Sequence, residues 1–72
     1  MPGITNRDRA EFARSAVRVF AEETGTHIEN LETQVCDLLA NLMHLCAEES
    51  IGWEQVSTMS EIHFNEEQAE ES

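Results

Sequence analysis

A chain of 72 residues suffices for one small domain, close to the lower size limit at which a single hydrophobic core is stable by itself. Its 15 acidic residues outweigh 4 basic ones, and the formal net charge of −11 argues against direct binding to nucleic acid or to an anionic membrane. No run of apolar residues is long enough for a membrane span or a signal peptide, so we expect a cytoplasmic protein.

The first predicted helix covers about residues 6–23, after a flexible lead-in at 1–5. Thr5 or Asn6 can cap this helix, and Asp8 lies in its first turn, where the helix dipole favours a carboxylate. Helical spacing places one apolar stripe on the inner face, made of Phe12, Ala13, Ala16, Val17 and Phe20.

The second predicted helix, about residues 27–49, is the centre of the expected fold. Gly25 is expected to end the first helix in the left-handed conformation. Thr26 and Glu29 have the spacing of a capping box that opens the second helix. Such a tight connection predicts that the two helices run antiparallel and touch.

Two rows of apolar residues make the inner face of the second helix unusually wide. The rows consist of Ile28, Leu31, Val35, Leu38, Leu42 and Leu45, and of Cys36, Leu39, Met43 and Cys46. One short helix on each side cannot easily cover both rows, and we therefore predict a homodimer. The predicted interface consists of Leu38, Leu39, Leu42, Met43 and Leu45.

The third predicted helix covers about residues 53–65 and follows a turn in which Ile51 is expected to enter the core. Its apolar stripe is thin and consists of Trp53, Val56, either Met59 or Ser60, and His63. Residues 66–72 hold nothing apolar larger than alanine, so we expect an acidic tail, disordered or a frayed extension of the helix. The predicted fold is an all-α, three-helix antiparallel bundle with a long central helix, in one domain at 6–65.

Cysteine and histidine show no spacing typical of a metal site or a disulfide. Cys36 and Cys46 are ten residues apart on one predicted helix, about 15 Å along its axis, which is too far for a disulfide bond. Both are typical of thiols in a reducing cytoplasm. There is no glycine-rich phosphate loop and no recognisable set of nucleophile, base and acid. We expect no enzyme activity, no catalytic residue, no metal and no cofactor.

The carboxylates of the second helix are the remaining candidates for a functional site, because clustered glutamates can bind Mg²⁺. The stretch from Glu32 to Asn65 resembles the second half of MazG-like all-α nucleoside triphosphate pyrophosphohydrolases. Asp37 on an acidic helix, the turn at 50–52 and the asparagine near the end of the last helix carry this resemblance. It implies a related helical topology and, as an alternative function, nucleotide binding or hydrolysis.

The metal-binding motif of that family is degenerate in this chain. Gln34 stands three residues before Asp37, where the family uses a glutamate for Mg²⁺. The first helix carries arginines instead of the family's Glu-x-x-Glu pair, and Glu61 and Glu66 replace basic residues of the last helix. A MazG-like protein with these residues is expected to be inactive.

The distribution of charge favours a non-enzymatic interaction protein. All four arginines lie before residue 19, and the rest of the chain holds 13 carboxylates without any lysine or arginine. We predict that it binds a basic protein surface, such as that of a nucleic-acid-binding protein, through Glu48, Glu49 and Glu54. One form of this hypothesis is a phage- or plasmid-type inhibitor that imitates phosphate charge. The simpler alternative is that the acidic surface serves solubility.

Overall fold

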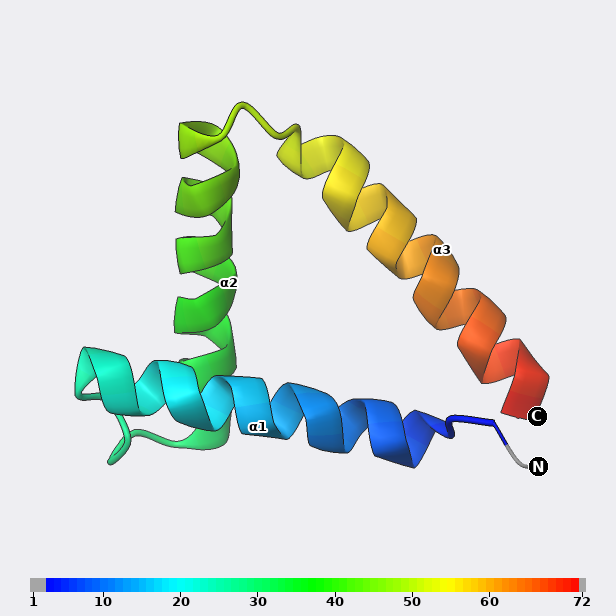
Figure 1. The fold of residues 1–72 in the computed structure, drawn as a ribbon, viewed down its shortest axis with the longest axis horizontal. Coiled ribbons are helices and arrows are strands. Elements are labelled where there is room, and N and C mark those ends of the chain that lie inside the picture. Colours follow the sequence, from blue (N-terminus) through cyan, green and yellow to red (C-terminus); the bar gives the residue numbers. More distant parts are fainter. Residues whose placement is uncertain (1–2, 72) are drawn as a thin grey trace.

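The computed structural model describes residues 3–71, and every element in that range is an α-helix. Helix α1 spans Asn6–Thr24, α2 spans Leu31–Glu48 and α3 spans Trp53–Glu71. Figure 1 shows the helices as the three sides of a triangle, which approach one another near its corners. The predicted all-α class and the three helices are confirmed. The single chain does not show the predicted antiparallel packing, because α1 and α2 cross instead of lying alongside each other (Figure 1).

Both ends of α1 are fixed by local hydrogen bonds that its sequence predicts. The Thr5 hydroxyl accepts a hydrogen bond from the Asp8 backbone N–H at 3.1 Å, and the Thr5 N–H donates to the Asp8 carboxylate at 3.0 Å. The bond from the Thr5 backbone N–H to the carboxylate is the main cause that holds the pKa of Asp8 below its ordinary value, and the Thr5 side chain and Arg9 add to the effect. At the other end Gly25 adopts the left-handed conformation with φ at 73°, as expected for this position.

Helix α2 begins later than predicted, at Leu31. The predicted capping box of Thr26 and Glu29 is wrong, because Asn30 is the capping residue. Its side-chain oxygen accepts a hydrogen bond from the Thr33 backbone N–H at 2.8 Å. The connection between α1 and α2 is therefore longer than expected, which lets α2 leave α1 in a different direction (Figure 1).

Gln34 holds this connection in place from within α2. Its side-chain amide donates to the backbone carbonyls of Thr26, His27 and Glu29, at distances of 3.2, 3.4 and 3.0 Å. These carbonyls would be free to accept intrahelical bonds if α2 began at residue 27. The Glu29 N–H also donates to the Thr26 carbonyl at 3.0 Å, so residues 26–29 form a turn that a backbone bond and the Gln34 amide hold together.

The corner between α2 and α3 is a turn closed by backbone hydrogen bonds. Ser50 has a positive φ of 57°, and the Ile51 N–H donates to the Cys46 carbonyl at 2.8 Å. The prediction that Ile51 enters the core is wrong, since its side chain is 47% exposed. Its backbone N–H closes the end of α2, and its side chain lies at the surface of the corner.

Helix α3 continues past the predicted end at residue 65, so residues 66–71 of the expected acidic tail are its last turns. Residues 1–2 of the lead-in and residue 72 of the tail lie outside the described part of the chain. No residue of α3 is buried, and the core of the described chain consists of Val17, Ala21 and Cys46. A core of this size leaves most apolar side chains uncovered.

Candidate functional site

The apolar face of α2 is the first candidate surface, and the single chain leaves it open. Leu38 is half-buried, whereas the other four residues of the predicted interface are exposed. Their exposed fractions are 47% for Leu39, 38% for Leu42, 48% for Met43 and 52% for Leu45. A large part of each of these side chains is therefore accessible to another chain.

The exposed apolar surface extends onto the other two helices, which the sequence did not indicate. The largest exposed side chains there are Phe12 and Val19 on α1, and Val56, Met59, Ile62 and Phe64 on α3. Helical periodicity places Phe12, Val56 and Met59 on inner stripes, but periodicity cannot say whether another helix covers a stripe. The three helices together enclose an opening of about 990 Å³, which is lined by Ala13, Leu39, Ser60, Glu61, Phe64 and Asn65.

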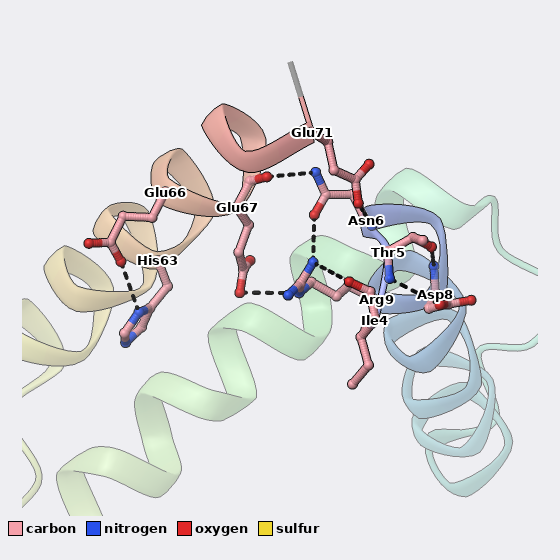
Figure 2. Close-up of polar contacts among 9 residues, drawn as sticks. All are labelled: Ile4, Thr5, Asn6, Asp8, Arg9, His63, Glu66, Glu67 and Glu71. Carbon is pink, nitrogen blue, oxygen red and sulfur yellow. Dashed lines mark hydrogen bonds and ion pairs between the residues drawn. The ribbon is translucent and has the colours of Figure 1, made fainter. Parts of the chain in front are cut away.

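Polar contacts join the start of α1 to the end of α3 (Figure 2). The Arg9 Nε atom lies 3.2 Å from a carboxylate oxygen of Glu67, and the Asn6 side-chain amide donates to the Glu67 carbonyl at 3.2 Å. The Asn6 backbone N–H, at the positive end of the α1 dipole, donates to the Glu71 carboxylate. We call this set the α1–α3 latch. Glu67 and Glu71, which were predicted to lie in the acidic tail, therefore each have a partner within the chain.

A second acidic cluster lies at the α2–α3 corner and consists of the predicted partner-binding residues. Glu48 and Glu49 end α2, and Glu54 lies in the first turn of α3. All three are exposed, and within residues 3–71 none of them belongs to an ion pair of 4 Å or less. The last turn of α2 holds no basic residue, so Glu48 and Glu49 face the negative end of its dipole without compensation.

The residues that carry the resemblance to MazG-like enzymes do not converge on a site. Gln34 is engaged with the backbone carbonyls before α2, and Asp37 is half-buried on the same helix. Asn65 lines the central opening from α3. Throughout the described part of the chain, no three His, Cys, Asp or Glu side chains are grouped in a way that could hold a metal ion.

Histidine and cysteine side chains form no metal-binding group within residues 3–71. His63, expected on an inner stripe, is exposed, and its Nδ1 atom lies 3.7 Å from a carboxylate oxygen of Glu66. Cys36 is exposed and Cys46 is buried, and both are free thiols. A basic groove of about 240 Å³ lies where α1 meets α2, with Arg14, Arg18 and His27 in its lining.

No family model, curated protein or solved structure matches this chain. In residues 3–71, no helix has both the length and the apolar character that crossing a bilayer requires.

Proposed function

We propose that this protein is a non-enzymatic interaction module that binds a basic surface of another protein. The observation that carries the proposal is the separation of charge between helices. All arginines belong to α1, whereas α2 and α3 hold no lysine or arginine and present carboxylates to solvent. Such a surface attracts a basic partner over a distance of about one Debye length.

The partner binds at the α2–α3 corner, through Glu48, Glu49 and Glu54. Within residues 3–71 these carboxylates have no ion-pair partner at 4 Å or less, and they lie next to the negative end of the α2 dipole, so a basic side chain would stabilise them there. The carboxylates of Glu67 and Glu71 are already bound in the α1–α3 latch. The corner is thus a better binding surface than the end of α3.

A shallow groove of about 380 Å³ beside the corner fits a long basic side chain. It is lined by Glu54, Gln55, Thr58 and Met59. The aliphatic part of a lysine or arginine can lie along Met59 while its charged end pairs with Glu54. A surface of this kind suits a protein that binds nucleic acid, because its phosphate-binding groups are cationic. A phage- or plasmid-type inhibitor that imitates phosphate charge in a reducing cytoplasm is the specific form of this proposal.

The working unit in this proposal is a homodimer. Its support is the apolar face of α2, where Leu39, Leu42, Met43 and Leu45 are exposed in one chain. A second copy of the same face would remove these side chains from water. Antiparallel packing of helices, which one chain lacks, would then arise between chains.

The alternative function, a MazG-like nucleotide-binding protein, finds less support. A pyrophosphohydrolase needs carboxylates that converge on Mg²⁺ and cationic groups for the phosphates. Gln34 stands where the family uses a glutamate, and its amide is occupied by the turn before α2. This alternative predicts pyrophosphate release from a nucleoside triphosphate with Mg²⁺, and we expect none.

A charge-substitution series tests the proposal. Glutamate is replaced by glutamine at Glu48, Glu49 and Glu54 together, and in a matched control at Glu22, Glu23 and Glu29, which are also exposed. Each triple variant removes the same charge. Proteins retained from host lysate by the wild type are identified by mass spectrometry, and binding of each purified candidate is measured at low and high salt.

A retained protein should lose affinity steeply with salt and with the corner variant, and far less with the control variant. Double-stranded DNA should compete for it if the partner's nucleic-acid-binding surface is involved. Equal loss with both variants, or affinity that is indifferent to salt, would contradict the proposal and leave solubility as the role of the acidic surface.

A further inference from the structure

The surface of this chain is larger than its mass accounts for. Its accessible area is 5952 Å², whereas a folded monomeric protein of 8.2 kDa exposes about 4,500 Å². The excess is therefore about 1,400 Å² per chain. Two chains that each buried this excess would hide about 2,800 Å² in total, which lies within the range of obligate homodimers.

The chain is also spread over too large a radius for its length. Its radius of gyration is 14.1 Å, whereas a compact domain of this length has about 11 Å. A compact body of twice the length has a radius of gyration of about 14.5 Å. One chain thus extends as far from its centre as a compact pair of chains would. A pair of these chains has the radius of gyration of a compact body only if the centres of the two chains nearly coincide.

We propose that a second copy of this chain fills the opening of the triangle, so that the two chains interpenetrate around a common centre. This inference rests on the homodimer of the proposed function and extends its interface from α2 to the inner faces of α1 and α3. Ala13, Leu39 and Phe64 line the opening from α1, α2 and α3, respectively. Contact with all three helices would cover the apolar side chains of this lining, such as Leu39 and Phe64, which are 47% and 57% exposed in one chain.

Charge complementarity supports a second copy as the occupant. Helix α1 carries every arginine of the chain, and α3 carries carboxylates without any cation. Within one chain these two helices already pair through Arg9 and Glu67. Arg14, whose Nε atom lies 3.5 Å from a Glu11 carboxylate oxygen, and Arg18 are exposed further along α1 and can meet the carboxylates of the other copy's α3.

Sedimentation equilibrium and small-angle X-ray scattering on the full chain test this arrangement. We expect the mass of a dimer and a radius of gyration of about 15 Å, as for two triangles whose centres lie one helix diameter apart. A dimer joined only along one edge, with centres about 30 Å apart, would have a radius of gyration of about 20 Å. That result would overturn the interpenetration and leave the homodimer standing. A monomer at tens of micromolar would overturn both.

A matched pair of substitutions locates the interface. Phe64→Ala removes a side chain that lines the opening, and Phe12→Ala removes the same group from an exposed site whose side chain is outside that lining. We expect Phe64→Ala to raise the dissociation constant of the dimer at least tenfold and Phe12→Ala to change it by less than threefold. Circular dichroism checks that both variants remain helical. Equal effects of the two substitutions would overturn the proposed geometry.

Discussion

Arg9 and Glu67 join the two ends of the chain, with the Arg9 Nε atom 3.2 Å from a Glu67 carboxylate oxygen (Figure 2). The contact joins α1 to α3, two helices that are not consecutive in the chain. Both side chains remain about one-third exposed, at 36% and 34%, so solvent screens their attraction. No buried residue lies among the polar contacts of the α1–α3 corner in residues 3–71, whereas Val17 and Ala21 are buried near the corner of α1 and α2.

Glu67→Gln should lower the free energy of unfolding by a small amount, about 0.2–1 kcal/mol, because it breaks an exposed ion pair. Urea denaturation at low salt measures this change, which should shrink at high salt. Glu70→Gln is the control, since it removes the same charge from the same end of α3. Equal effects of the two substitutions would mean that the latch does not stabilise the chain.

Thr5→Ala should cost about 1 kcal/mol of stability, because Thr5 accepts the hydrogen bond of the Asp8 N–H at the start of α1. Thermal or urea denaturation measures the loss. Thr58→Ala, an exposed change within α3, serves as the control and should have little effect. A Thr5→Ala variant as stable as the wild type would show that the cap is dispensable.

The pKa of Asp8 predicts a specific dependence of stability on pH. Its carboxylate accepts the Thr5 backbone N–H, so its pKa is lower in the folded chain than the ordinary value of 3.8. The stabilisation is therefore fully present above about pH 4 and is lost as pH falls through the lower folded pKa. Asp8→Asn should be less stable than the wild type near pH 6, and the difference should close below pH 4. Unfolding curves at several pH values test this, and a difference independent of pH would refute it.

Local signals in the sequence predict α1 well and the start of α2 poorly. Thr5, Asp8 and Gly25 act within a few residues of themselves, so their roles follow from spacing alone. Thr26 and Asn30 are both good capping residues, and the choice between them depends on Gln34, which reaches back to the turn. No rule of sequence spacing predicts a contact of this kind, in which a side chain reaches back across a turn.

Burial and ion pairing between distant residues were harder to predict. Ile51 and His63 were expected to be covered, but the Ile51 side chain lies at the surface of the α2–α3 corner and the His63 side chain is exposed on α3. The end of α3 has no cation nearby in the sequence, yet Arg9 lies beside it in space. By contrast, Glu48, Glu49 and Glu54 share one corner as expected, because the turn between them is short.

Gln34→Glu should destabilise the chain and should not produce an enzyme. The substitution restores the glutamate of the MazG-like motif, but it also replaces an amide donor by a carboxylate facing three backbone carbonyls. The carbonyls of His27 and Glu29 then lose this donor, whereas the Thr26 carbonyl keeps the bond from the Glu29 N–H at 3.0 Å, and each hydrogen bond contributes about 0.5–1.5 kcal/mol. We expect a loss of about 1–3 kcal/mol, measured by urea denaturation.

Gln55→Glu is the control for this experiment, because it makes the same chemical change in the first turn of α3, where the dipole favours a negative charge. It should leave stability unchanged or raise it slightly. Pyrophosphate release from a nucleoside triphosphate with Mg²⁺ should stay at background for wild type and for Gln34→Glu. Release above background that Asp37→Ala abolishes would instead support the MazG-like alternative.

Leu42→Ala distinguishes a chain that is stable alone from one that is stable as a dimer. In a single chain Leu42 is 38% exposed, so its truncation would cost much less than the 2–5 kcal/mol of a buried leucine. In the proposed homodimer it is buried at the interface, and the full loss of about 2–5 kcal/mol should appear. The thermal midpoint of the wild type should also rise with protein concentration, because dimerisation is coupled to folding.

Leu31→Ala, on the same helix but outside the predicted interface, should change the midpoint less. A midpoint independent of concentration, with a small effect of Leu42→Ala, would show that the exposed face of α2 has no second chain on it.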